Sequence, residues 1–432
     1  MSARSKDLSA DTNPKELANR RFNGARVICR RRVKQRDVIT VIEEEATPGG
    51  NLPLACMNDS PGSRATFRDV DKEKRDPRDM KVVDGIPGDR PWVYRRSPAG
   101  AGDPFSVLLP DKLGVVGNSA LGPWAINKGG EYLTLECGHS LTPPELFDNP
   151  TTEGVSAIHP PKDLGGNPDR DRLGRVEIHP LNTATREEYD SGVIVFGKDN
   201  VDPNRAVEVR PLLWGGFYTF TQDVKVDEKP KALNSPKGRI TDVWLRESVP
   251  TVSSGRAFQM TPHASDIDLS KVMEGDLEVQ SLPSKGGRKV YVTVSGLLGR
   301  VTGWEVIGEK HLGEAVLMCG PKSGLTEGRI WAVDAWVDGL HYSPKHTGSF
   351  KGWFLVEPVG RRSFSRPGDS GVAVYFPREG REKRKQLVVC GQVVAGIVIG
   401  DTEDEKKSYT LVQPIGPCLD RWKSRLLTSS ST

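Results

Sequence analysis

Residues 364–376, Phe-Ser-Arg-Pro-Gly-Asp-Ser-Gly-Val-Ala-Val-Tyr-Phe, place a glycine-bounded serine directly before an apolar run. A second apolar run, QLVVCGQVVAGIVIGD, follows at residues 386–401. Runs rich in β-branched residues and bounded by turn residues predict strands. We therefore expect Ser370 on a loop that precedes a β-hairpin, because the flanking glycines permit a tight turn.

The same pattern extends outward from this hairpin over most of the chain. Short β-branched runs bounded by turn residues recur from about residue 105, such as FSVLL, EYLTLEC, SGVIVFG, KVYVTVSG and RIWAVDAWV. Many short strands separated by turns indicate a sandwich or a barrel. The end of the chain differs, because Leu419, Trp422 and Leu426 follow a proline at helical spacing. The sequence thus predicts an all-β fold with a short C-terminal amphipathic helix.

Composition bounds the kind of protein. The chain has 432 residues, enough for a core that needs no disulfide or structural metal. Its 46 Gly and 32 Pro favour a turn-rich β protein. The net charge of +4 does not by itself indicate nucleic acid. The six cysteines lack a CxxC pair, so we expect isolated thiols and no metal or other cofactor. Neither a secretory signal nor a long apolar run is present, so we expect a soluble, intracellular protein without membrane contact.

The segment Gly368-Asp369-Ser370-Gly371 suits a nucleophilic serine, whose reaction needs N–H groups converging on the oxygen that becomes negative. The N–H groups of Gly368 and Ser370 are the candidates for this oxyanion hole. A serine also needs a base, and His139 ends a strand-like run in small residues within YLTLECGHSL, residues 132–141. We expect its imidazole at a barrel rim, where it can act as a general base.

The base in turn needs a carboxylate that fixes its tautomer. Asp190 opens the apolar run in EEYDSGVIVF, residues 187–196, and is the first candidate. Asp242 in ITDVWLR, residues 240–246, is the alternative, although the following Trp and Arg fit a core strand less well. For both, the structural interpretation is a carboxylate at a turn or strand edge.

The order His139, Asp190, Ser370, with Gly-Asp-Ser-Gly around the serine, resembles the chymotrypsin-like serine peptidases, in particular their intracellular, largely uncharacterised members. Four segments carry the resemblance in order: GNSALGPWAINKGGEYLTLECGHSL, YDSGVIVF, CGPKSGLTEGRIWAV and FSRPGDSGVAVY. The resemblance implies two six-stranded antiparallel β-barrels with a triad in the cleft between them. It assigns His139 as general base, Asp190 as its orienting acid, Ser370 as nucleophile, and Gly368 with Ser370 as the oxyanion hole.

The expected domains follow from this resemblance and from composition. Residues 1–104 are a basic, partly disordered leader, whose first forty residues carry eleven Lys and Arg against four Asp and Glu, a net charge of +7. Residues 105–427 form the peptidase domain, with an insertion within about 198–285, because 180 residues separate Asp190 from Ser370. Residues 428–432 are a flexible tail. No Ile-Val-Gly-Gly-like segment is visible, so activation by a freed N-terminal amine that pairs with Asp369 is not expected.

Three functions are in competition. The first is a serine endopeptidase that cleaves polypeptides through an acyl-enzyme. The second is a catalytically weak or inactive peptidase-like module that binds extended peptides, and the third is nucleic acid binding through residues 1–40. Phe364 is expected near the base of the specificity pocket, where no carboxylate supports a preference for Arg or Lys. Residues 320–326 are expected to form a structural turn that supports the pocket wall.

Overall fold

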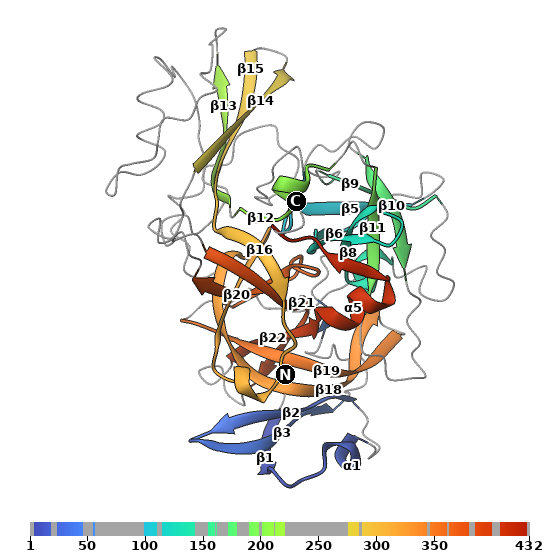
Figure 1. Cartoon of the computed structure of the whole chain (residues 1–432), viewed down its shortest axis with the longest axis vertical. Helices are drawn as coiled ribbons and strands as arrows, with labels where there is room; N and C mark the ends of the chain where they lie inside the picture. The colour runs from blue at the N-terminus through green and yellow to red at the C-terminus, as the bar shows by residue number, and fades with distance from the viewer. Residues whose placement is uncertain are drawn as a thin grey trace.

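The structure is a computed structural model. It describes residues 4–18, 24–45, 55–56, 99–109, 115–142, 154–159, 161, 172–178, 190–197, 201–210, 212–220, 275–284, 287–343, 346–360, 363–379, 385–399 and 407–429. Two curled β-sheets dominate these ranges (Figure 1). The helices are short: α1 (Pro14–Ala18), α2 (Gly138–Leu141), α3 (Pro203–Ala206), the 3-10 helix η9 (Glu309–His311) and α5 (Ile415–Arg421).

The first sheet comes from residues 104–196, with residues 424–426 added at one edge. Its strand order is β23-β7-β8-β11-β10-β9-β5-β6. Neighbouring strands run antiparallel. Its inner face buries Phe105 and Ile194, and the rings of Trp124 and Phe196 lie 4.4 Å apart. The strands are β5 (Pro104–Leu108), β6 (Val115–Ala120), β7 (Trp124–Asn127), β8 (Tyr132–Glu136), β9 (Ser156–Ile158), β10 (Arg172–Ile178), β11 (Gly192–Phe196) and β23 (Ser424–Leu426).

The second sheet has the order β1-β3-β2-β18-β17-β20-β21-β16-β12, with β4, β19 and β22 also paired to it. Strands β18 and β19 pair with repeated register shifts, which allow the sheet to curl. The rings of Phe350 and Trp353 stack 4.4 Å apart in its core. The strands are β1 (Arg4–Ser9), β2 (Gly24–Val33), β3 (Arg36–Glu45), β4 (Ala55–Cys56), β12 (Glu208–Val209), β16 (Gly299–Trp304), β17 (Ala315–Gly320), β18 (Gly324–Ser343), β19 (His346–Pro358), β20 (Ala373–Glu379), β21 (Lys385–Ile399) and β22 (Lys407–Pro414).

A third, three-stranded sheet consists of β13 (Leu212–Phe220), β14 (Gly275–Ser284) and β15 (Gly287–Gly296). Figure 1 shows it extending away from the two curled sheets. β13 and β14 fall within the insertion expected at about 198–285, and residues 221–274 lie outside the described residues. The expected limits of the insertion therefore stay a prediction.

Part of the expected leader is built into the second sheet, because β2 pairs with β18 and β3 pairs with both β2 and β1. The turn between β2 and β3 contains Lys34 and Gln35, both at positive φ. The three consecutive arginines of β2 each form an ion pair with a carboxylate: Arg30 with Glu309 at 3.4 Å, Arg31 with Asp7 at 2.7 Å and Arg32 with Asp37 at 3.0 Å. Much of the positive charge of this run is thus compensated within the chain.

The predicted fold class, a mostly antiparallel chymotrypsin-like double β-barrel with a short C-terminal helix, is confirmed. The two described sheets have eight and twelve strands, where the resemblance implies six in each barrel, and β16 pairs parallel with β21. The helix is shorter than the spacing of its apolar residues predicts. It ends at Arg421, Lys423 adopts a positive φ of 47°, and Leu426 belongs to β23, which pairs with β7. Within the described ranges, none of the helices is both long and apolar enough to cross a membrane.

Candidate active site

The predicted base and nucleophile meet where the two curled sheets face each other. His139 lies in the one-turn helix α2, directly after β8 of the first sheet. Ser370 lies in the turn before β20 of the second sheet. The His139 Nε2 and Ser370 Oγ atoms are 3.0 Å apart, although 231 positions separate the residues. His139 is 2% exposed and Ser370 is fully buried.

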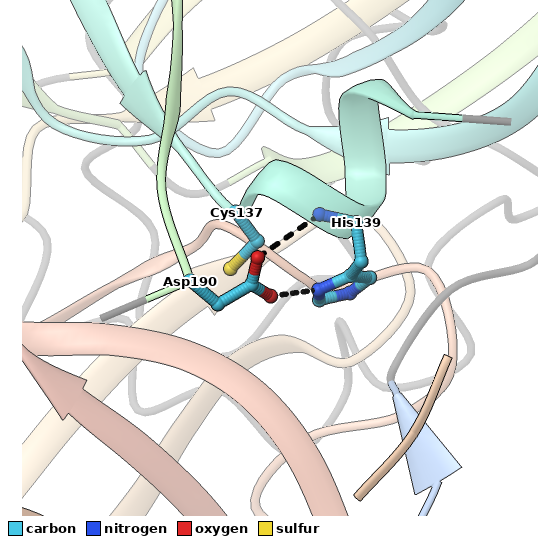
Figure 2. Close-up of side chains that lie close together, drawn as sticks. All are labelled: Cys137, His139 and Asp190. Atoms are coloured by element: carbon cyan, nitrogen blue, oxygen red, sulfur yellow. Dashed lines mark hydrogen bonds and ion pairs between the residues drawn. The ribbon is translucent and has the colours of Figure 1, made fainter. Parts of the chain in front are cut away.

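Strand pairing brings the predicted acid to the same place. Asp190 precedes β11, which pairs with β8 so that Gly192 lies opposite Glu136. The Asp190 carboxylate binds His139 twice: Oδ2 is hydrogen-bonded to the ring Nδ1, and Oδ1 accepts the backbone N–H at 3.1 Å (Figure 2). A Cβ on Gly138 would lie only 2.8 Å from Asp190 Oδ1, so this approach requires glycine. With Nδ1–H held by the carboxylate, the lone pair of Nε2 faces the Ser370 hydroxyl and can accept its proton.

The structure thus brings His139, Asp190 and Ser370 together in one hydrogen-bonded row. Asp242, the alternative acid, lies outside the described residues. Ser370 Oγ is also within 3.3 Å of the Val394 carbonyl, to which it can donate. Asp190 and His139 come from the first sheet and Ser370 from the second, so the row depends on the packing between the sheets.

The turn around the serine leaves the two predicted oxyanion donors available. Gly368 and Gly371 adopt positive φ of 97° and 90°, which favour glycine. The Asp369 N–H donates to the Arg366 carbonyl at 3.0 Å, and the Gly371 N–H donates to the Val393 carbonyl at 2.9 Å. Among the hydrogen bonds between described residues, the N–H groups of Gly368 and Ser370 have no acceptor. These two donors are therefore free to bind a ligand oxygen.

Asp369 supports this turn from behind. Its carboxylate is fully buried and accepts hydrogen bonds from the Ser323 hydroxyl at 2.5 Å, the Lys322 N–H at 3.0 Å and the Arg366 N–H at 2.8 Å. Burial raises its pKa, although these donors act in the opposite direction. Residues 320–326, expected to form a structural turn, thus fold against the loop of Ser370. With the Ser323 N–H, which lies 3.4 Å from Oδ1, the donors are three backbone amides and a hydroxyl, in place of a freed N-terminal amine.

A pair of buried glutamines was missed by the sequence reasoning. Gln392 and Gln413 lie directly opposite each other on β21 and β22, and both are fully buried. Gln413 holds the backbone of Asp190 at both polar groups: its Oε1 accepts the Asp190 N–H at 2.7 Å, and its Nε2 donates to the Asp190 carbonyl at 2.9 Å. Their signal in the sequence is a single polar residue inside each of two apolar runs, LVVCGQVVAG and YTLVQP.

Gln392 extends this network to the other two predicted residues. Its Nε2 donates to the carbonyl of Leu135, in the strand that leads to His139, at 2.6 Å, and to the carbonyl of Gly371, next to Ser370, at 3.2 Å. Gln413 Nε2 lies 3.4 Å from Gln392 Oε1. The two side chains of the second sheet therefore hold the backbone of Asp190, of the residue after Ser370, and of Leu135 in the strand that leads to His139. Buried polar networks of this kind rigidify a site when every member is satisfied.

We expect Gln413→Met to lower kcat for peptide hydrolysis by a factor on the order of 10², because Asp190 loses both backbone contacts and shifts relative to His139. The KM should stay within a few-fold of the wild type, because Gln413 acts through the backbone of Asp190. Steady-state kinetics at one fixed pH separate kcat from KM. Cys390→Ala, which removes a buried thiol of β21 that donates to Val374, is the matched control and should leave kcat within a few-fold of the wild type. A kcat of Gln413→Met equal to that of Cys390→Ala would contradict the positioning role.

Glu136 is a second buried group that the sequence reasoning missed. It precedes Cys137 in β8 and is fully buried. Its Oε1 accepts the Gly122 N–H at 3.0 Å, and its Oε2 has no partner among the described residues. A Cβ on Gly371 would lie 2.8 Å from this Oε2, which places the carboxyl behind the loop of Ser370. Burial raises the pKa of Glu136 to about 8.

Cys137, His139 and Asp190 are the group of described residues whose donor atoms lie close enough to hold a metal ion, all within 4.8 Å of one another (Figure 2). Each donor already has a protein partner, because Cys137 Sγ donates to the Val393 carbonyl at 3.3 Å and His139 Nδ1 is bound to Asp190. Among the described cysteine side chains none forms a disulfide; Cys29, Cys390 and Cys418 are buried, and Cys319 is partly exposed.

No protein-family model matches the chain, and no curated protein matches it. Among solved structures, protease A of Thermobifida fusca aligns at 14% identity with a TM-score of 0.34, over 77% of this chain and 100% of that one. A Nocardiopsis protease aligns at 14% identity with a TM-score of 0.33, over 75% and 96%. A glutamic-acid-specific serine protease aligns at 11% identity with a TM-score of 0.33, over 76% and 100%. Similarity at this level concerns the fold and carries over no activity.

Proposed function

We propose that the chain is a serine endopeptidase in which Ser370 is the nucleophile, His139 the general base and Asp190 the group that orients the base. The row of hydrogen bonds from Asp190 through His139 to Ser370, at the junction of the two sheets, carries this proposal. The four ordered segments of the resemblance support it further, and they favour a place among the intracellular members of that family. The substrates proposed are polypeptides.

In the proposed reaction, Ser370 Oγ attacks the carbonyl carbon of a peptide bond while His139 Nε2 takes the hydroxyl proton. The carbonyl oxygen becomes negative and accepts hydrogen bonds from the N–H groups of Gly368 and Ser370. The C–N bond then breaks, and His139 gives the proton to the leaving amine. Water attacks the resulting ester with His139 again as base, which releases the carboxylate product and returns the proton to Ser370.

Asp190 contributes by holding the ring of His139 in one orientation and by stabilising the imidazolium that forms transiently. Its two contacts with His139 restrict both the ring and the backbone of the base. The Gln392–Gln413 pair and the carboxylate of Asp369 hold the participating loops from behind, so that the site is arranged before substrate binds. Such preorganisation lowers the reorganisation needed in the transition state.

An active-site fluorophosphonate probe tests this proposal. We expect it to label Ser370 covalently, because an activated serine attacks the phosphorus of the probe as it would attack the carbonyl carbon of a peptide. Peptide mapping by mass spectrometry locates the adduct. Ser370→Ala should abolish labelling and His139→Ala should slow it strongly. Ser429→Ala, at the far end of the chain, is the control that should label as the wild type does. Labelling at another residue, or none in a folded sample, would favour the alternative of a peptidase-like module that binds peptides without cleaving them.

A further inference from the structure

A short segment of the expected leader lies on the edge of the sheet that carries the site. β4, residues Ala55–Cys56, pairs antiparallel with β21 so that Cys56 lies opposite Ala395 and Ala55 opposite Gly396. Ala395 and Gly396 pair with β22 on their other side. β4 therefore occupies the edge of β21 that β22 leaves open, and it also touches the end of β18, where Ala55 lies opposite His341.

This edge adjoins the proposed nucleophile. Val394, directly before Ala395 in β21, offers its carbonyl to Ser370 Oγ at 3.3 Å. In an antiparallel ladder, moving back along β21 from Ala395 to Val394 corresponds to moving forward along the partner strand. A chain that continues past Cys56 in the register of β4 is therefore carried toward Ser370, at about 3.4 Å per residue. β4 has the direction that would deliver a following peptide bond to the nucleophile.

The proposed nucleophile and base are shielded from solvent. In the whole chain Ser370 is 0% exposed and His139 is 2% exposed, so neither has appreciable contact with solvent. An endopeptidase must admit an extended polypeptide to these atoms. Recognition of an extended peptide by addition to a sheet edge relies on main-chain hydrogen bonds, which any sequence can supply, including a segment of the same chain.

We propose that β4 is an intramolecular pseudosubstrate: the leader occupies the edge of β21 on which an extended peptide lies during cleavage, and substrates enter only when β4 leaves. This inference rests on the proposed function of the same site. A tethered competitor acts at an effective concentration in the millimolar range, so it raises the apparent KM for peptides without altering the chemistry of the bound complex. The leader thus regulates the site by competition.

Paired substitutions in the full chain test the proposal. Ala55→Pro/Cys56→Pro removes both backbone N–H groups and disrupts strand pairing, whereas Ala55→Ser/Cys56→Ser changes the same side chains and keeps the backbone donors. We expect the proline variant to show a KM for peptide hydrolysis at least about tenfold lower than the serine variant, with kcat unchanged. Equal KM values in the two variants would overturn the proposal.

A binding measurement separates this proposal from the proposed function. In the Ser370→Ala background, a fluorescein-labelled synthetic peptide of residues 51–60, NLPLACMNDS, is titrated with each variant and followed by fluorescence anisotropy. The proline variant should bind it at least about tenfold more tightly than the serine variant. Equal or absent binding overturns the pseudosubstrate. If binding differs as expected while the wild-type residue at 370 supports no hydrolysis in any variant, the pseudosubstrate contact stands and the peptidase function fails.

Discussion

Ser370→Ala is expected to lower kcat for hydrolysis of a fluorogenic peptide by a factor on the order of 10⁶, and His139→Ala by a similar factor. The double variant should lose no more than either single one, because a base without a nucleophile, or a nucleophile without a base, performs no part of the reaction. This non-additivity follows from the 3.0 Å contact between His139 Nε2 and Ser370 Oγ. Rates are measured at saturating peptide on samples whose circular dichroism spectra match that of the wild type.

His311→Ala is the matched control for this experiment. His311 is 2% exposed, as His139 is, and its Nε2 lies 3.0 Å from Glu305 Oε1, while its ring stacks on Phe376. Its loss disturbs a buried histidine outside the candidate site, so kcat should stay within a few-fold of the wild type. Losses that multiply in the Ser370→Ala/His139→Ala double variant would show that the two residues act independently, which contradicts the proposed proton transfer.

The parts of the site that sequence could anticipate are those whose chemistry is local. The glycines around Ser370 and the small residues before His139 mark turns, and each residue ends or opens an apolar run. A carboxylate before a strand is common in ordinary turns, so the sequence leaves Asp242 as an alternative to Asp190. Its role depends on the pairing of β11 with β8, which brings Gly192 opposite Glu136. Strand register of this kind is set by packing and turn geometry over long separations.

The supporting residues could not be assigned from sequence for the same reason. Gln392 and Gln413 become neighbours only through the register of β21 and β22, and Gln413 reaches Asp190 only because the two sheets pack together. Polar composition did not indicate that β1, β2 and β3 pair into the second sheet, and the partly disordered leader over residues 1–104 stays a prediction. β3 contains the apolar, β-branched run VITVI, residues 38–42, which is typical of a strand, but its partner is β2, and the partner of β2 is β18, about 300 residues further along.

The Asp369 carboxylate ties the loop of the proposed nucleophile to Lys322 and Ser323. The carboxylate is already saturated by Ser323, Lys322 and Arg366, so the loop has its donors without a cleaved N-terminus. The control proposed for this site therefore differs from activation by a cleaved N-terminus. It acts on access to the edge of β21, through β4, while the proposed base and nucleophile already lie 3.0 Å apart.

Glu136→Gln is expected to remove a strong pH dependence of stability. The carboxyl of Glu136 has a pKa of about 8 in the folded chain against 4.5 as the ordinary value, because it is fully buried. Between these pH values the folded state keeps a proton that the unfolded state has lost, so the free energy of unfolding falls as pH rises. The stability that Glu136 contributes is fully present below pH 4.5 and is lost as pH rises through 8. The free energy of unfolding falls by up to about 5 kcal/mol over this range.

Glutamine has the same shape and does not titrate, so the stability of Glu136→Gln relative to the wild type should rise steadily from pH 5 to pH 8. Thermal unfolding in the Ser370→Ala background, where self-digestion is absent, measures this difference at several pH values. Asp369, whose pKa burial also raises, is present in both proteins and cancels in the comparison. Glu131→Gln is the control: its pKa is lowered by Arg175, so its contribution is lost only as pH falls and should add no slope above pH 5. Parallel stability curves for the wild type and Glu136→Gln would mean that Glu136 is ionised behind the loop of Ser370, and its unpaired Oε2 would then need a hydrogen-bond donor.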